Sequence, residues 1–447
     1  MARLFRNYRI LTLLLGDLLI LWAGLLVVLG GRYGFTKFDH VLQLHVLPFS
    51  IVFAMWLTIF YISGLYDVRN TQETATLLRT LIYTVATNGI LAMMLFYFVP
   101  FFIITPKINL MLDIGLTAAL LTAWRLIVAR FATTASKVRV LLFGDSSEIN
   151  ELASAITRYP QLGYHIAARA KTIHELSTLL QAHTIEIVVA PKDAQIDTTF
   201  VHTIYDTLHR GVRFIDAATF YEKILGKIPV TLISKTWFLE NIAETEKYFF
   251  ESIKRGFDIL FAIILGTITI VTLPIVILII TLDSRGPLFI RQKRVGRHGK
   301  EFILYKYRTM IALSPDGLAE THGAVWAEKN DKRVTRMGKI LRTTRIDELP
   351  QLWNVLRGDL SFIGPRPERP EFVRELALHI PYYEMRNLVR PGLSGWAQIN
   401  PPYYYGTDKE ALLKLQYDLY YIKNRDLGLD LEIVLKTLAV ILSARGR

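Results

Sequence analysis

Long apolar runs dominate the first third of the chain, and their spacing predicts membrane helices. They cover residues 10–30, 46–66, 81–102 and 108–132. A helix needs about 20 apolar residues to cross a hydrocarbon core of about 30 Å, and each run has that length. The first run is too long for a signal peptide and lacks an Ala-x-Ala cleavage site, which indicates a retained anchor. The pattern predicts a four-helix transmembrane region over residues 1–133.

Basic residues on both flanks of this region predict its orientation. They precede the first run and accompany the end of the fourth (Arg3, Arg6, Arg9, Arg125, Arg130, Lys137 and Arg139). Because basic flanks remain in the cytoplasm, both ends of the bundle are expected there. Asp17 and Asp113 lie inside the runs, where an acid is a functional candidate. We favour the alternative that both face the bundle interior and pair with arginine or hydroxyl groups.

A fifth apolar run, residues 259–282, predicts a re-entrant helix over about residues 255–283. Pro274 removes a backbone donor in its middle and predicts a break there. Basic residues flank the run on both sides (Lys254, Arg255, Arg285 and Arg291). A helix that enters, bends and returns keeps both flanks in the cytoplasm, whereas a crossing helix does not.

Between the apolar regions, short strand-like runs alternate with amphipathic stretches. Strands are predicted at 138–143, 185–190 and 212–215, and helices at 148–159 and 198–210. This alternation is typical of a parallel, doubly wound sheet, and it predicts a Rossmann-like cytosolic domain over residues 134–240. Gly144 begins a dinucleotide fingerprint whose later glycine positions hold Ser146 and Ile149. A structural or regulatory role is therefore favoured over nucleotide binding.

Composition narrows the chemistry of the remaining segment. The chain has 447 residues, 52% of them hydrophobic, a formal charge of +13 and no cysteine, and its ten histidines are scattered. These counts exclude a disulfide scaffold, a thiolate zinc site and a cysteine nucleophile. Residues 285–345 hold 15 Lys or Arg against 5 Asp or Glu, a surface suited to anionic lipid or a phosphorylated substrate. No nucleic-acid module pattern appears, so a nucleic-acid partner is not expected.

Adjacent acids stand beyond this basic stretch, at Asp347 and Glu348. Pro350 fits the first turn of a helix, so the pair is expected near a helix N-terminus. The helix dipole and nearby guanidinium groups there favour ionisation. An ionised aspartate can attack phosphorus, and a neighbouring glutamate can hold Mg²⁺. The competing interpretation is a helix cap beside a surface ion pair.

Several cations surround this pair in sequence. Arg366 lies between two prolines in a turn-rich loop, and Arg390 precedes Pro391 and Gly392. An arginine held in this way loses little freedom on binding a phosphate. Lys306, Arg308 and Arg342 lie upstream as further phosphate-binding candidates.

These blocks together resemble the bacterial polyprenyl-phosphate glycosyl-1-phosphate transferases, the sugar-transferase family that initiates exopolysaccharide and O-antigen assembly. The resemblance covers residues 247–447 through five segments in order (Lys306–Met310, Asp331–Asn354, Gly358–Pro367, Arg390–Asn400 and Asp418–Thr437). It implies a mostly α, monotopic catalytic domain at the inner membrane of a bacterial cell, facing the cytoplasm. The whole chain is similar to the large membrane form of the family, and the resemblance leaves a homodimer open.

The resemblance also implies roles for matching residues. Asp347 would attack the sugar-linked phosphorus of a UDP-sugar and release UMP, and Glu348 would help bind Mg²⁺. Arg342 and Arg366 would hold phosphate oxygens, and polyprenyl phosphate would take the phosphosugar. Pro274 would be the helix break. The family often has serine before this proline, whereas this chain has Leu273, so Thr272 is expected to supply hydrogen bonds at the bend.

Two other functions are weighed against this one. A membrane-anchored nucleotide-sugar dehydratase or epimerase needs a working glycine loop and a Tyr-x-x-x-Lys pair. That spacing occurs only at Tyr33–Lys37 and Tyr405–Lys409, far from Gly144. A scaffold that binds anionic lipid without chemistry would make Asp347 dispensable.

Overall fold

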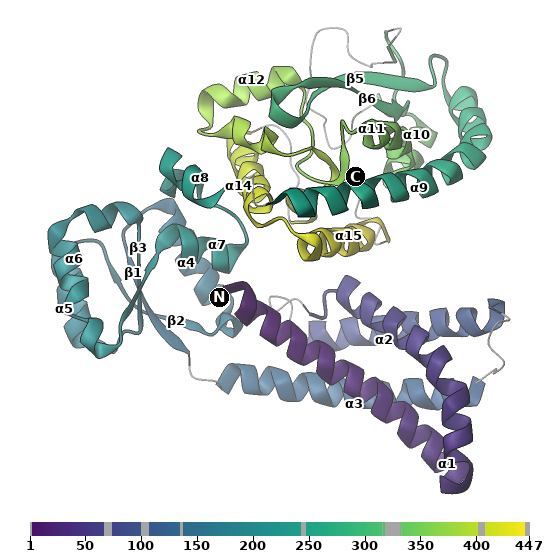
Figure 1. The fold of residues 1–447 in the computed structure, drawn as a ribbon, viewed down its shortest axis with the longest axis horizontal. Helices are drawn as coiled ribbons and strands as arrows, with labels where there is room; N and C mark the ends of the chain where they lie inside the picture. Colours follow the sequence, from purple (N-terminus) through teal and green to yellow (C-terminus); the bar gives the residue numbers. More distant parts are fainter. Residues whose placement is uncertain are drawn as a thin grey trace. The chain divides into compact units, whose positions relative to one another are not determined.

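A computed structural model describes residues 2–66, 74–99, 107–134, 137–242, 247–314, 316–317, 331, 333–400 and 407–442 (Figure 1). The chain forms two compact units, Met1–Leu225 and Gly226–Arg447. The division falls before the boundary at residue 240 that the sequence predicted. Residues 226–242 pack within the second unit, where the Trp396 indole donates to the Gly226 carbonyl over 2.8 Å.

The apolar part of the first unit contains three helices, α1 (Ala2–Ile62), α2 (Thr74–Phe98) and α3 (Lys107–Thr134). Helix α1 is kinked at Gly34, whose φ of 66° suits a residue without a Cβ. The kink separates two stretches long and apolar enough to cross a membrane, Ile10–Gly34 and Thr36–Ile62. Residues 31–45 were expected to link two helices, but the structure shows them as helix on both sides of this kink.

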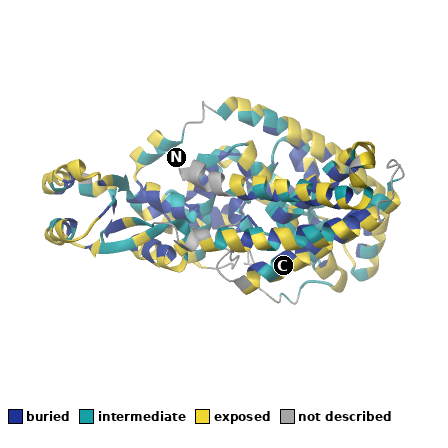
Figure 2. Ribbon diagram, turned by 90° about the horizontal axis from the view of Figure 1, so that it is seen from below, coloured by how far each residue is buried: buried dark blue, intermediate teal, exposed yellow. Residues whose placement is uncertain are grey.

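The interior of these helices is apolar with a few paired polar groups. Leu21, Phe53 and Trp56 are fully buried, and buried positions alternate with exposed ones along the long helices (Figure 2). Asp17 accepts hydrogen bonds from Tyr66 and Arg125. Asp113 accepts one from Thr117. The predicted pairing of both acids with arginine or hydroxyl groups is confirmed.

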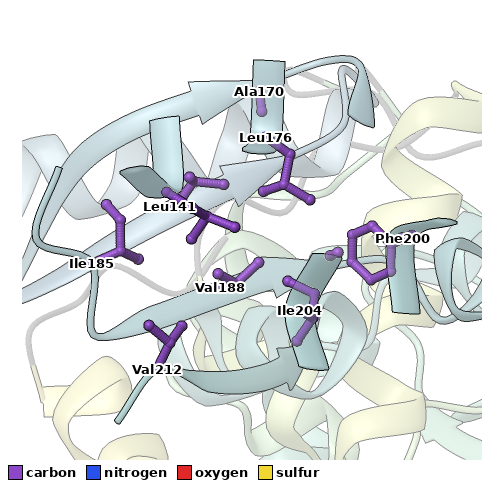
Figure 3. Packing of buried hydrophobic residues seen from close by; sticks show 10 residues of the cluster. Leu141, Ala170, Leu176, Ile185, Val188, Phe200, Ile204 and Val212 are labelled. Atoms are coloured by element: carbon purple, nitrogen blue, oxygen red, sulfur yellow. The ribbon is translucent and has the colours of Figure 1, made fainter. Parts of the chain in front are cut away.

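A four-stranded parallel sheet in the order β2-β1-β3-β4 follows in the same unit. Its strands are β1 (Val138–Phe143), β2 (Tyr164–Ala170), β3 (Ile187–Ala190) and β4 (Arg213–Asp216), with α4 (Ser147–Arg158), α5 (Ile173–Ala182), α6 (Thr198–Tyr205) and α7 (Ala217–Leu225). One core packs Leu141 and Val188 of the sheet against Leu176 of α5 and Phe200 of α6 (Figure 3). The predicted parallel sheet is confirmed. Strand β2 was missed because three of its seven residues are alanine and it contains no continuous run of large apolar residues.

The loop after β1 caps the N-terminus of α4. Gly144 has a φ of 112°, and the Ser146 hydroxyl accepts from Ile149 N at the start of α4. The second fingerprint position is therefore an N-cap. A structural role for this loop stays our interpretation.

The second unit is mostly helical. After α8 (Lys235–Asn241) and α9 (Tyr248–Asp283) come the antiparallel strands β5 (Phe289–Val295) and β6 (Glu301–Tyr307). The later elements are α10 (Arg336–Thr343), the 3-10 helix η8 (Ile346–Gln351), α11 (Leu352–Arg357), β7 (Ser361–Ile363), α12 (Pro370–His379), the 3-10 helix η9 (Tyr383–Leu388), β8 (Gly392–Ser394), α13 (Trp396–Ile399), α14 (Asp408–Asn424) and α15 (Leu427–Leu442).

Helix α9 is anchored at its N-terminal end and exposed beyond it. Asp258 accepts from Ser361 Oγ at 3.1 Å and from Phe362 N at 3.0 Å, and Lys254 pairs with Asp430. Farther along, most apolar side chains point away from the unit, among them Ile270, Val271, Ile275 and Leu278. The anchoring turns fix the helix to the unit and leave its apolar length uncovered.

The predicted break at Pro274 needs correction, because α9 remains helical from Tyr248 to Asp283. Its ribbon still bends in the C-terminal part, which contains Pro274 (Figure 1). Proline deletes one helical hydrogen bond, yet neighbouring residues can keep the helix continuous. Thr272 donates to the carbonyls of Ile268 and Thr269, which belong to the preceding turn. These are not the carbonyl of Ile270, which lacks its helical donor because Pro274 has no N–H.

Strands β7 and β8 pair in parallel and bring two distant loops together. Glycines allow the close approach, because a Cβ on Gly364 would lie 2.4 Å from the Arg390 carbonyl oxygen. A Cβ on Gly392 would lie 2.1 Å from Gly364 N. The loops that carry Arg366 and Arg390 are thus joined through main-chain atoms.

Candidate active site

The site forms where η8 lies against strand β6. Asp347 and Glu348 occupy the first turn of η8, which leads into α11. The Asn354 side chain joins α11 to β6, donating to Ile303 O at 2.7 Å and accepting from Tyr305 N at 3.3 Å. This bridge fixes the two acids beside Lys306, one residue farther along β6.

Glu348 is held by three cations. Its Oε1 lies 3.0 Å from Arg366 Nη2, 3.3 Å from Lys306 Nζ and 3.3 Å from Arg345 Nη1. Burial alone raises the pKa of a carboxyl, but Arg366, Lys306 and Arg345 together outweigh it and hold the pKa of Glu348 well below its usual range. Glu348 is therefore a fixed negative charge.

Asp347 has a different environment. Its side chain is 6% exposed, and its Oδ1 is buried with no hydrogen-bond partner among the residues that the structure describes. Burial raises the pKa of Asp347, opposed first by the charge of Lys306, while Glu348 adds to the rise. The sequence predicted that ionisation would be favoured, and this direction is corrected: desolvation outweighs the nearby cations.

Lys306 and Arg342 face the acids as partly desolvated cations. Burial lowers the pKa of both, and the charge of Asp347 opposes that change in each. The Arg342 Nε donates to Thr309 Oγ1 at 2.8 Å, which fixes one edge of the guanidinium. The structure therefore groups Lys306, Arg342 and Arg366 with the acid pair.

Two predicted phosphate-binding residues are not grouped with Glu348. Arg308 is buried and donates to the Ser284 carbonyl, at the end of α9, over 2.6 Å. The Arg390 side chain makes no ion pair or hydrogen bond within the described part of the chain, although its main chain lies beside Gly364. Their roles in phosphate binding stay predictions.

Arg345 was not singled out from the sequence. It takes a left-handed conformation with a φ of 59°, which is uncommon for a residue with a side chain. This conformation starts η8 and turns the Arg345 side chain toward Glu348. Its place three residues before Glu348 was the available signal, but a helical surface pair has the same spacing.

The carboxylates offer a partial site for Mg²⁺. The three cations contact Oε1 of Glu348, whereas Oδ1 of Asp347 has no hydrogen-bond partner among the described residues and is available to a ligand. No group of three or more acids or histidines that could hold a metal occurs within the described residues. Mg²⁺ commonly takes one or two carboxylates and completes its shell with substrate phosphates and water. The residues therefore fit a metal brought together with a diphosphate.

Comparisons with known proteins agree with this arrangement. Residues 249–444 match the family model described as bacterial sugar transferase. The sugar transferase EpsL of Bacillus subtilis is 38% identical over 194 residues, covering 43% of this chain and 89% of that protein. A UDP-N-acetylgalactosamine-undecaprenyl-phosphate N-acetylgalactosaminephosphotransferase of Aeromonas hydrophila is 46% identical over 194 residues, 43% of this chain and 44% of the relative.

A third relative is a UDP-glucose:undecaprenyl-phosphate glucose-1-phosphate transferase of Xanthomonas campestris pv. campestris, 38% identical over 169 residues. These cover 37% of this chain and 34% of that protein. The chain thus matches less than half the length of the Aeromonas and Xanthomonas relatives, but most of EpsL. On the family model and the extent of the EpsL match, the chain belongs to the bacterial sugar transferase family.

Proposed function

We propose that this protein transfers a sugar-1-phosphate from a UDP-sugar to polyprenyl phosphate. The observation that carries the proposal is the contrast within the acid pair: Glu348 is neutralised by three cations, whereas Asp347 keeps a buried oxygen without a partner among the described residues. A nucleophile needs a lone pair that is not already bound, close to cations that neutralise the group it attacks. The names of two relatives, which act on undecaprenyl phosphate, support the acceptor class.

The reaction proceeds in two displacements at one phosphorus. A carboxylate oxygen of Asp347 forms a bond to the sugar-linked phosphorus, and the bond from that phosphorus to the UMP oxygen breaks, so UMP leaves with the electron pair. A phosphate oxygen of the polyprenyl carrier then attacks the same phosphorus and releases the Asp347 carboxylate. The lipid diphosphate sugar is the product.

Positioning and charge neutralisation carry most of the catalysis in phosphoryl transfer. Arg366 and Lys306 orient phosphate oxygens over the acid pair, and Arg342 approaches from α10. Bound Mg²⁺ would be held by Asp347 and Glu348 and would neutralise diphosphate oxygens. Burial raises the pKa of Asp347, and cations that arrive with the donor would favour its charged form.

We propose that this chemistry takes place at a bacterial inner membrane, with the second unit in the cytoplasm. The four apolar stretches of the first unit cross the bilayer, and α9 enters the cytoplasmic leaflet, bends and returns. Support comes from the exposed apolar side chains of α9 and the basic residues on both sides of it. Because the chain has no cysteine, an Arg285→Cys variant tests the topology: labelling from the cytoplasmic side alone is expected.

The reaction is tested with purified full-length protein in nanodiscs that contain polyprenyl phosphate. UMP release is measured for UDP-N-acetylgalactosamine, UDP-glucose and UDP-galactose, with and without a chelator. Release from at least one donor, lost on chelation, is expected. Without acceptor, mass spectrometry should find a phosphosugar on the peptide that contains Asp347. A protein that releases no UMP from any donor contradicts the proposal, and release without an adduct contradicts the covalent step.

The dehydratase alternative lacks support from the structure. Tyr33 lies in the apolar part of the first unit, where Asn109 donates to its hydroxyl, and Tyr405 lies outside the described residues. A lipid-binding scaffold predicts no UMP release, so the same assay excludes it.

A further inference from the structure

A second group of buried charges lies behind the loop that carries Arg366. Its members come from three elements and one loop: Arg294 of β5, Glu368 of the loop, Arg386 of η9, and Lys414 and Asp418 of α14. The Arg386 side chain is 2% exposed and that of Asp418 is 1% exposed. We call these five residues the support cluster.

Ion pairs connect the support cluster throughout. Arg386 Nη2 lies 2.8 Å from Asp418 Oδ2, and Arg386 Nη1 lies 3.8 Å from Glu368 Oε1. Lys414 pairs with the same oxygen of Glu368, and Arg294 Nη1 lies 3.7 Å from Glu368 Oε2. Each acid is therefore neutralised inside the cluster.

The support cluster also binds the main chain of the Arg366 loop at successive residues. Arg386 Nη2 donates to the Arg366 carbonyl over 2.9 Å, and Arg294 Nη1 donates to the Pro367 carbonyl over 3.1 Å. At the next residue, the Glu368 carbonyl accepts from Val295 N at 2.9 Å. Three successive carbonyls are thus fixed from β5 and η9.

A buried ion cluster is poor evidence for stability, because apolar side chains of similar volume often stabilise as well or better. Its directed hydrogen bonds give something apolar packing does not, which is a defined position for the groups they hold. On the other side of the same loop, Arg366 Nη2 lies 3.0 Å from Glu348. We infer that Arg386, oriented by Asp418, is a positioning residue that sets where the Arg366 guanidinium meets Glu348 and the donor phosphates.

The geometry predicts how the loss of one acid from the support cluster changes the position of Arg386. Asp418→Asn removes the anion nearest to Arg386 and leaves Glu368 as its acid partner. Arg386 then moves toward Glu368 and away from the Arg366 carbonyl. A misplacement of about 1 Å at a reacting centre can cost up to about 100-fold in rate, and we expect about a tenfold loss in kcat/KM here.

The inference rests on the proposed transferase activity and is tested by a double-mutant cycle on full-length protein in nanodiscs, with UMP release as the signal. Asp418→Asn, Arg366→Ala and the double variant are compared with wild type. If Asp418 acts through Arg366, its tenfold effect falls below about twofold once Arg366 is replaced by alanine. A general loss of structure would multiply with the Arg366→Ala effect instead, and full multiplication overturns the inference.

Asp430→Asn is the matched control. Asp430 is a carboxylate of α15 in the same unit, paired with Lys254, and it makes no recorded contact with the Arg366 loop within the described residues. Its effect on UMP release, whatever its size, should be the same in the wild-type background as in the Arg366→Ala background. The two effects should therefore multiply, in contrast to those of the Asp418 cycle.

A second variant keeps the test decisive if Asp418→Asn shows no cooperative thermal transition. Arg386→Lys then replaces it in the cycle. Lysine keeps the charge but offers one donor group, so the same dependence on Arg366 is expected. A wild type without UMP release contradicts the proposed function itself, whereas an active wild type with a multiplying cycle contradicts only the positioning role.

Discussion

The second unit contains two clusters of buried charge that differ in how far they are closed. In the support cluster, Glu368 and Asp418 are paired with Arg294, Arg386 and Lys414, and the Arg386 side chain is 2% exposed. Around Asp347 and Glu348, four cations gather, Arg345 is 38% exposed, and one Asp347 oxygen has no partner within the described residues. In the support cluster, the acids have counterions within the cluster. The group formed by Asp347, Glu348 and the four surrounding cations, which we call the open cluster, has an excess of cations that an anionic substrate can neutralise.

The largest difference should appear when each cluster loses one acid. Asp347→Asn is expected to lower UMP release more than about 1,000-fold, because it removes the proposed nucleophile. Since burial raises the pKa of Asp347, the folded state disfavours the charged form, and the free energy of unfolding at pH 7 should stay the same or rise by up to about 1 kcal/mol. Chemical denaturation beside the activity assay checks both. A clear loss of stability, as expected for Glu368→Gln in the support cluster, would remove the distinction between the clusters.

The next effect concerns the residue that both clusters touch. Arg366→Ala should lower kcat/KM by about 100-fold, the usual consequence of removing one donor to developing charge. Stability should also fall, because Arg366 contributes most among the cations that hold the buried Glu348 carboxylate in its charged form. Arg366→Lys keeps the charge without the planar fork and should recover part of the activity. Equal losses in the alanine and lysine variants would show that geometry alone matters.

The support cluster should make the free energy of unfolding depend on pH. Burial raises the pKa of Glu368, but Lys414, Arg386 and Arg294 outweigh this effect and lower the pKa from 4.5 to about 2. The stabilisation is therefore complete above pH 4.5 and is lost as pH falls toward about 2. Glu368→Gln should lower the free energy of unfolding at pH 7 by about 3 kcal/mol. Denaturant titrations should show the gap between variant and wild type closing below pH 4.5; a constant gap would contradict the assigned charge state.

The smallest expected effect is that of Arg390→Ala on stability. Its side chain has no recorded partner within the described residues, so the free energy of unfolding should change by less than about 0.5 kcal/mol. If Arg390 binds phosphate as the sequence predicts, the variant should raise KM for the donor severalfold. Unchanged kinetics would place Arg390 outside the open cluster.

Much of the open cluster was predictable, because its acids are adjacent and its cations lie in local motifs. Lys306, Arg342 and Arg366, which the sequence singled out as phosphate-binding candidates, lie around the acid pair, and their binding of phosphate stays a prediction. Arg345 was missed because its left-handed backbone cannot be read from composition. The contact of Arg308 with the Ser284 carbonyl at the end of α9 could not be predicted, because the strand pattern does not reveal which element packs against it.

The support cluster could not be predicted, since its members are spread along the chain from Arg294 to Asp418 and meet only through tertiary packing. The same holds for α1, where the chain between the first two apolar runs was expected to link two separate helices. A single glycine kink there leaves both sides helical. The fold class could be predicted from the periodicity of apolar residues. The positions of residues that meet only through tertiary packing could not.

The close contact of Gly364 and Gly392 between β7 and β8 makes one spacing independent of the surrounding side chains. Because the two glycines meet through main-chain atoms, the backbone sets the distance between the two arginine loops. Under the proposed function, side chains that contact the sugar could be replaced without moving Arg366 and Arg390, the residues expected to hold the diphosphate. Sugar specificity and diphosphate binding would then be adjustable separately.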